Sequence, residues 1–196
     1  MKALKAIIIC ALVVAVSAAA AAQSANDESQ ILHVLERLGF GPRPGDVERV
    51  RAMGLDKYIA LQLEPARIDD TAVAQRLAQF ETLGLGSREM ASRYFTPPQQ
   101  NRQRPQPPQM TPPPDEPGRM PAAPEAQRAA RAQANLPLIE LSQQKLLRAV
   151  YSERQLEEVL VDFWFNHFNV FAGKGQFARF YLTEYEREAI RPHVLG

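Results

Sequence analysis

The feature that most constrains this 196-residue chain is a run of aromatic side chains near its end. Nine of its fifteen Phe, Trp and Tyr residues lie between positions 163 and 185, and the run begins with Phe163-Trp164-Phe165-Asn166-His167-Phe168. Rings of this size bury a large apolar area, so such a run needs a cover. The chain ends at Gly196, soon after the run. We therefore expect a domain that is incomplete at its C-terminus.

Residues 1–22 have the composition of a secretory signal peptide. Lys2 and Lys5 carry positive charge, an apolar run follows up to Val16, and small residues come next. A permanent membrane anchor is the alternative, but the apolar run is shorter than the roughly 20 residues that span a bilayer. We expect a mature protein that begins near Gln23, is periplasmic or secreted, and has no membrane span after cleavage of the signal.

The cysteine content and the charge balance limit the chemistry of the mature chain. Its single cysteine, Cys10, lies in the signal, so neither disulfides nor thiolate metal sites are expected and the fold must depend on a hydrophobic core. The chain has 23 Lys and Arg residues against 22 Asp and Glu residues, and two of the lysines belong to the signal. A nearly neutral mature chain has no electrostatic reason to bind nucleic acid, and we expect no such partner.

Residues 23–95 predict the N-terminal helical part of the domain. Apolar residues recur at spacings of three and four, and no segment alternates with period two as a strand would. Glycine and proline divide the pattern into short helices. We expect one helix from Asp27 to Leu38, one from Pro44 to Gly54, one from Asp56 to Leu63, one from Asp70 to Leu83, and one that begins at Ser87.

Residues 96–124 interrupt the helical pattern. They hold eleven of the sixteen prolines and five glutamines, and proline prevents both helices and sheets from continuing. We interpret them as a disordered linker or surface insertion of polyproline character. The alternative is a docking segment, since Pro105 to Pro108 and Pro114 to Pro117 have the Pro-x-x-Pro spacing.

Residues 125–196 predict a second helical part of the same domain. Helix resumes after Pro124 and strengthens from Pro137 through Val150. A turn over residues 169–175 and a last helix over residues 176–190 follow. The fold class expected for the whole chain is therefore all-α, an irregular multi-helix domain with a proline-rich insertion.

The helix that carries the first aromatic residues has the clearest amphipathic pattern. Ser152 and Gln155 have the spacing of a capping box at its start. The offsets predict one buried stripe, made of Leu156, Val159, Leu160, Phe163 and His167. The opposite face carries Glu158, Asp162 and Asn166, and we expect Asn166 to cap or brace a neighbouring loop.

Three segments together resemble a known bacterial family, the domain of unknown function 1800. They are residues 33–42, residues 163–170 and residues 188–196, and they occur in the family's order with helical spacers between them. The resemblance implies a mostly helical exported protein, often encoded beside a sulfatase-like family, with no established activity. An envelope protein such as that neighbour is the partner it implies. In the family the chain continues beyond the third segment, so the resemblance also implies a missing C-terminal part.

The three histidines are the candidate catalytic residues, because His33, His167 and His193 each lie in one of these segments. Imidazole titrates near neutral pH and is the commonest metal ligand. Separations of 134 and 26 residues mean that only tertiary folding could bring them together. The structural interpretation gives His33 a solvated helix face, makes His167 a core histidine, and places His193 at a helix C-terminus.

The remaining motifs do not identify a cofactor, a metal or a reaction. Glu184, Glu186 and Glu188 predict a solvated acidic face paired with Arg187 and Arg191. Neither a phosphate-binding loop nor a nucleophile elbow occurs. Two hypotheses follow. The first is a cell-envelope binding or assembly partner without catalysis, and the second is an exported hydrolase or metal-dependent enzyme whose histidine-centred site the missing part completes.

Overall fold

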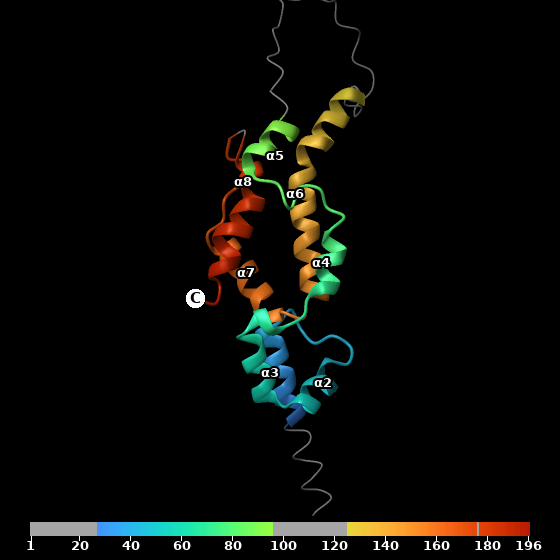
Figure 1. The fold of residues 1–196 in the computed structure, drawn as a ribbon, viewed down its shortest axis with the longest axis vertical. Coiled ribbons are helices and arrows are strands. Elements are labelled where there is room, and N and C mark those ends of the chain that lie inside the picture. The colour runs from blue at the N-terminus through green and yellow to red at the C-terminus, as the bar shows by residue number, and fades with distance from the viewer. Residues whose placement is uncertain (1–26, 96–124, 176) are drawn as a thin grey trace, which may run out of the picture. The chain divides into compact units, whose positions relative to one another are not determined.

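The computed structural model describes residues 27–95, 125–175 and 177–196 (Figure 1). All regular structure in these ranges is helical, which confirms the all-α fold class. The predicted signal peptide and the proline-rich insertion lie outside the described residues. No helix within the described ranges combines the length and the apolar character needed to cross a membrane.

The chain folds as two compact units, each of which draws on both helical parts of the sequence. The first unit combines the residues up to Gln79 with Gln143–Asn169 and Glu186–Gly196. The second combines Phe80–Ser142 with Val170–Tyr185. Helix α6, Glu125–Tyr151, contributes residues to both units. The sequence pattern did not predict this partition.

The first unit has its core where the first described helix, residues 27–38, meets α2 and α3. Ile31, Leu35, Val50 and Tyr58 are buried together there. Gly45, at φ 85°, precedes α2, and Gly54, at φ 93°, separates it from α3, so the chain turns twice in a conformation that favours glycine. Helix α2 comprises Asp46–Met53 and α3 comprises Leu55–Gln62. The unit also contains η1 Pro65–Arg67, α4 Thr71–Leu77, α7 Gln155–His167 and η3 Arg191–His193.

The second unit packs α5, Ser87–Tyr94, against α8, Ala178–Glu184. Its core consists of Met90, Tyr94 and Phe180. Phe95 stacks on Phe177 with their ring centroids 4.8 Å apart. These contacts confirm the predicted helix over residues 87–94 and its buried apolar face.

Helix α4 ends at Leu77, six residues before the predicted end at Leu83. Within the second unit, the carboxylate of Glu140 accepts hydrogen bonds from the backbone N–H groups of Glu81 and Thr82. A side chain therefore takes the place of helical carbonyl acceptors in the segment after α4. A periodicity argument cannot foresee this competition, because it considers apolar spacing alone.

Helix α6 was predicted correctly at both ends. It starts at Glu125, directly after Pro124, and it runs through Pro137, where the strong segment was predicted to begin. Leu141 is buried, but Leu146 and Val150 are exposed. The buried positions on the helix include Glu140 and Gln144, so polar contacts replace part of the expected apolar face.

The stripe predicted on α7 is wrong in its second half. Leu156 is buried, but Phe163 is 53% exposed and His167 is exposed as well. The buried face instead carries Gln155, Glu158 and Val161, spaced three residues apart. Polar side chains occupy this face because partners on other helices satisfy them, as shown below.

The capping box predicted at Ser152 is also wrong. Helix α7 begins at Gln155 and is preceded by Arg154. The Ser152 hydroxyl accepts a hydrogen bond from the Arg154 N–H and donates one to Asp70. Ser152 therefore fixes the turn between α6 and α7 to the segment before α4 and does not cap the helix.

The last predicted helix changes its geometry along its length. Helix α8 passes into a π-helix, η2 Tyr185–Ile190, and then into the 3₁₀ turn η3. The π-helix is rare, and where it occurs it is often found at functional sites. Its wider turn changes which side chains face inward, and Glu186 and Ile190 are the residues of η2 that are buried.

Candidate ligand-binding site

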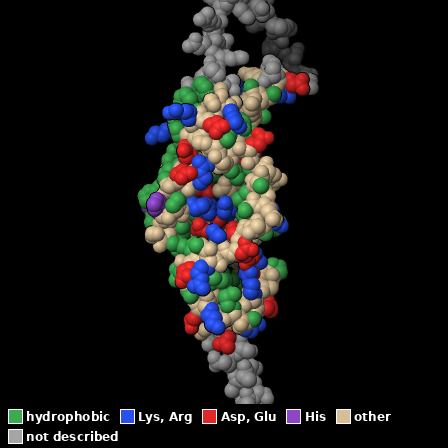
Figure 2. Space-filling model, viewed as in Figure 1, with side chains coloured by type: hydrophobic (Ala, Val, Ile, Leu, Met, Phe, Trp, Pro, Cys, Tyr) green, Lys and Arg blue, Asp and Glu red, His purple; other side chains and the backbone are tan. Residues whose placement is uncertain are grey.

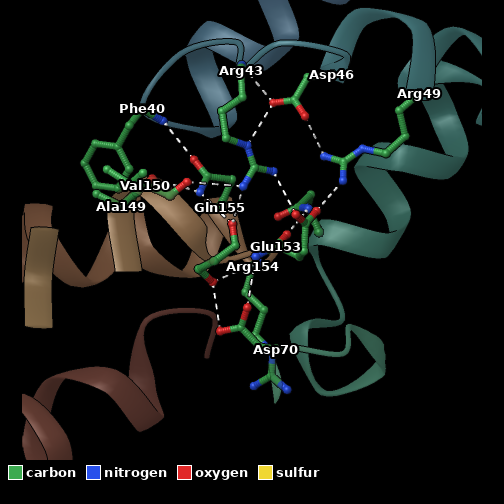
Figure 3. Close-up of polar contacts among 12 residues, drawn as sticks. Phe40, Arg43, Asp46, Arg49, Asp70, Ala149, Val150, Glu153, Arg154 and Gln155 are labelled. Atoms are coloured by element: carbon green, nitrogen blue, oxygen red, sulfur yellow. Dashed lines mark hydrogen bonds and ion pairs between the residues drawn. The ribbon is translucent and has the colours of Figure 1, made fainter. Parts of the chain in front are cut away.

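The loop that follows the first described helix is held in place by a polar network. The N–H of Phe40 donates to Gln155, and the guanidinium of Arg43 donates to the carbonyl of Ser152 and to the carboxylate of Glu153 (Figure 3). Asp46 accepts from Arg43 and from Arg49, and Arg49 also pairs with Glu153. This loop clamp fixes Phe40 beside the α6–α7 turn.

A second network, which we call the buried ion cluster, joins α6, α7 and the π-helix. The guanidinium of Arg191 binds both carboxylate oxygens of Glu158, at 2.8 and 3.0 Å, and donates to Oε1 of Glu186 at 3.0 Å. Arg148 donates to Glu158 at 3.1 Å, and Gln144 donates to Oε1 of Glu186 at 2.9 Å. The cluster consists of these five residues.

The buried ion cluster carries balanced formal charge, with two carboxylates and two guanidiniums. The side chains of Glu158 and Glu186 are only 4% and 1% exposed. Burial alone would lower the pKa of Arg191, but hydrogen bonds and charge attraction, chiefly from Glu158, outweigh it and raise that pKa. Arg191 is therefore a fixed cation that neutralises the two buried carboxylates.

One carboxylate oxygen in the cluster lacks a hydrogen-bond donor. Oε2 of Glu186 is buried and has no partner among the described residues, although Oε1 of the same side chain accepts two hydrogen bonds. Nε of Arg148 is likewise buried and unpartnered. Buried polar atoms almost always find a partner, so each exception needs an explanation.

A cavity of about 250 Å³ lies against this cluster. Three cluster members, Glu158, Glu186 and Arg191, form part of its lining, whereas Arg148 is not among the lining residues. The remaining wall is mainly apolar and also contains an ion pair between Lys145 and Asp162, at 2.8 Å. The apolar members of the wall are Phe40, Leu146, Ala149 and Val161.

Two of the three segments that the sequence analysis singled out contribute residues to the lining of this cavity. Phe40, from the first segment, and Arg191, from the third, both line it. Phe165, from the second segment, lies under the ammonium group of the lining residue Lys145, which is 4.0 Å from its ring centroid. The face drawn in Figure 2 shows Lys and Arg side chains interspersed with Asp and Glu, as expected from paired rather than segregated charge.

The three candidate histidines are placed elsewhere in the first unit. His33 is exposed on the first described helix, and His193 is exposed at the end of η3. His167 ends α7, and its ring contacts those of Phe163, Trp164 and Phe168. Because His167 is exposed, its interpretation as a core histidine is wrong. None of the contacts found in the described residues joins one histidine to another, and these residues contain no group of three His, Cys, Asp or Glu side chains suited to a metal.

Sequence reasoning missed the glutamates of the buried ion cluster. Glu186 was assigned to a solvated acidic face and Glu158 to the face opposite the predicted buried stripe, yet both are buried. A signal for Glu186 was present, because it lies four residues from Leu182 and four from Ile190, and all three are buried. For Glu188 the predicted solvated position is correct, since its side chain is 62% exposed and pairs with Arg187.

The described residues form an all-helical fold with a small cavity that is lined by both apolar and charged side chains. The sequence profile of the family described as "Protein of unknown function (DUF1800)" matches residues 33–196, and the chain belongs to this family. The match begins at His33, where the first family-like segment begins. Comparisons with curated proteins and with solved structures found no significant match.

Proposed function

We propose that this protein is an exported binding protein of the bacterial cell envelope that holds a small polar ligand in the cavity beside the buried ion cluster, without catalysis. The observation that carries the proposal is the cavity itself. It combines an apolar wall with a buried carboxylate, that of Glu186, one oxygen of which has no hydrogen-bond donor among the described residues. Binding sites for small molecules have this composition, a mainly apolar lining with a few placed polar groups.

The polar groups around the cavity favour recognition over reaction. Both oxygens of Glu158 accept hydrogen bonds from arginines, and both terminal nitrogens of the Arg191 guanidinium donate to the two glutamates. Among the described residues that line the cavity there is no Ser, Thr, Cys, Tyr or His side chain. Covalent catalysis needs a nucleophile beside a base, and proton transfer needs a group free to exchange protons.

The cellular location in this proposal comes from the composition of residues 1–22. An envelope partner, such as a member of the sulfatase-like family, belongs to the proposal as a protein with which this chain would act. Fractionation of cells that express the full-length protein should recover a product beginning near Gln23 outside the cytoplasm. Recovery of an unprocessed chain in the cytoplasm would contradict this part of the proposal.

Native mass spectrometry of the protein purified from cells tests the binding function. We expect one small-molecule adduct per chain, identifiable by its mass. In an Ala149→Trp variant the indole fills the cavity, and the adduct should be lost. Ala52→Trp is the matched control, because Ala52 is exposed on α2 and does not line the cavity.

Two results would contradict a non-catalytic binding function. The first is equal small-molecule content in the parent protein and the Ala149→Trp variant. The second is turnover of esters or sulfate esters that His167→Gln abolishes while leaving the melting temperature unchanged. The second result would establish the alternative, an exported hydrolase or metal-dependent enzyme that uses His33, His167 and His193.

A further inference from the structure

We infer that the cavity selects a compact organic cation, a primary ammonium or a guanidinium on a short apolar chain, which donates a hydrogen bond to Oε2 of Glu186. The inference rests on the proposed binding function and specifies the ligand class. Three features of the site support it. They are the open carboxylate oxygen, the unequal neutralisation of the two buried glutamates, and the shape and exposure of the apolar wall.

The open oxygen defines what the ligand must supply. Glu186 is 1% exposed, and its Oε1 already accepts from Gln144 and Arg191. A carboxylate offers only acceptors when it is ionised, so the group that completes Oε2 must be a donor. Leaving such an oxygen unpaired in a buried site costs free energy that a donor from the ligand would recover.

The two buried glutamates are not neutralised equally. Glu158 accepts three hydrogen bonds, all from the guanidinium groups of Arg148 and Arg191. Glu186 shares Arg191 through a single N–H group, and its other donor is the uncharged amide of Gln144.

The remaining cation of the lining does not compensate Glu186, because Lys145 is paired with Asp162 at 2.8 Å and lies over Phe165. Glu186 therefore has fewer cationic donors than Glu158, and its Oε2 is the oxygen that lacks a partner. Charge-assisted hydrogen bonds are about twice as strong as neutral ones, so a cationic donor is preferred there over a hydroxyl or an amide.

The apolar wall sets the size of the ligand and its route of entry. A volume of about 250 Å³ is below the range of roughly 300–1,000 Å³ that is typical of drug-sized ligands, which indicates a chain of only a few carbons. Ala149 and Val161 line the cavity along with Phe40 and Leu146. Phe40 and Leu146 are 49% and 67% exposed, so the wall reaches the protein surface and a ligand can enter past them.

A comparison of four probes with short apolar chains tests this inference on the full-length protein. The probes are n-butylammonium, n-butylguanidinium, n-butanol and butyrate, and binding is measured by NMR titration. We expect the two cations to bind at least tenfold more tightly than butanol and butyrate. In Glu186→Gln this preference should disappear, because the carboxylate charge is removed while the side-chain shape is kept. Glu188→Gln, which removes an exposed charge from the same π-helix, should retain it.

The possible outcomes separate the ligand class from the proposed function. Equal cation affinity in the parent protein and Glu186→Gln, or butyrate binding as tightly as butylammonium, overturns the inference. A native adduct that Ala149→Trp removes would leave the binding function intact in that case. If Glu186→Gln fails to fold, butylammonium binding that survives in Ala149→Trp overturns the inference, and its loss there supports it.

Discussion

Two buried glutamates, Glu140 in the second unit and Glu186 in the first, show how the same side chain can serve different purposes. Glu140 is 6% exposed, and its two oxygens accept from the N–H of Glu81 and from both the N–H and the hydroxyl of Thr82. Glu186 is 1% exposed, but its Oε2 accepts no hydrogen bond from the described part of the chain. Both oxygens of Glu140 therefore accept hydrogen bonds from the described residues, whereas one oxygen of Glu186 accepts none.

The difference lies in the donors that surround each carboxylate. Glu140 is held by neutral donors of a short loop, and these fix the conformation of that loop. Glu186 is held by Arg191, a cation that must also neutralise Glu158. We conclude that Glu140 is a structural residue, whereas Glu186 combines a structural contact with an unfilled recognition contact. Four substitutions test this comparison.

The largest effect is expected for Arg191→Met, which removes the cation shared by Glu158 and Glu186. Removing one member of a buried ion cluster leaves uncompensated charge and costs about 3–5 kcal/mol of unfolding free energy. Chemical denaturation measures this loss. Arg51→Met is the control, because Arg51 forms an exposed pair with Glu28 and should cost no more than about 0.5 kcal/mol. Similar losses in the two variants would contradict the account.

A smaller loss is expected for Glu140→Ala, since the donors left behind are neutral. Buried donors without an acceptor cost about 1–3 kcal/mol each, and the N–H of Thr82 and its hydroxyl, which is fully buried, lose theirs. We expect a loss of about 2–3 kcal/mol in equilibrium denaturation. Glu89→Ala, which breaks an exposed pair with Arg93 on α5, should change stability by less than about 0.5 kcal/mol. A loss below 1 kcal/mol for Glu140→Ala would mean that its contacts do not organise the loop.

Buried glutamates such as these are also the residues whose positions could not be predicted from the sequence. Helix positions were predicted well where apolar spacing decides them, as for α5, whose buried residues include Met90 and Tyr94. Prediction failed where polar groups are buried. The pattern for α7 placed Glu158 opposite the predicted buried stripe, and nothing in local spacing indicates that Arg191, 33 residues later, neutralises it.

The candidate site was correspondingly harder to predict than the fold. Its carboxylates depend on partners from distant helices and, for Glu186, on a π-helix that has no simple periodic signature. The family-like segments did point to the right regions, because Phe40 and Arg191 line the cavity. The histidines in those segments drew attention because imidazole is so often functional, but it is the neighbouring residues that line the cavity.

The loop clamp gives an intermediate case, because its charges are partly exposed. Arg43 is 24% exposed and contacts Asp46, Glu153 and the Ser152 carbonyl, so Arg43→Ala should cost about 1–2 kcal/mol. Arg49→Ala, in the same network but 40% exposed, should cost about 0.5 kcal/mol. Thermal and chemical unfolding of both variants measure the difference. An equal loss of unfolding free energy in the two variants would show that the contribution of an arginine in this network does not depend on how deeply it is buried.

The smallest effect on stability is expected for a substitution of Glu157. Burial raises the pKa of this side chain, and the positive charge of Arg191 opposes the shift. Because its folded-state pKa exceeds the unfolded value, the folded form of Glu157 binds its proton more tightly, and its ionisation weakens the fold as pH rises. Glu157→Gln should therefore be at least as stable as the parent protein at pH 7. This advantage should shrink as the pH falls through the raised folded-state pKa, and it should be absent below the unfolded value, near 4.5. Stability measured against pH checks the sign, and a loss of stability at pH 7 would contradict it.

The most direct test of the central claim is a carboxyl ¹³C NMR titration with n-butylammonium. The resonances of Glu186 and Glu140 can be assigned by their loss in Glu186→Gln and Glu140→Gln. If Glu186 is the open acceptor, its resonance should shift in a saturable manner as the cation is added, while that of Glu140 stays in place. An unmoved Glu186 resonance, or equal shifts at both glutamates, would contradict the claim that Glu186 is the carboxylate that receives the ligand.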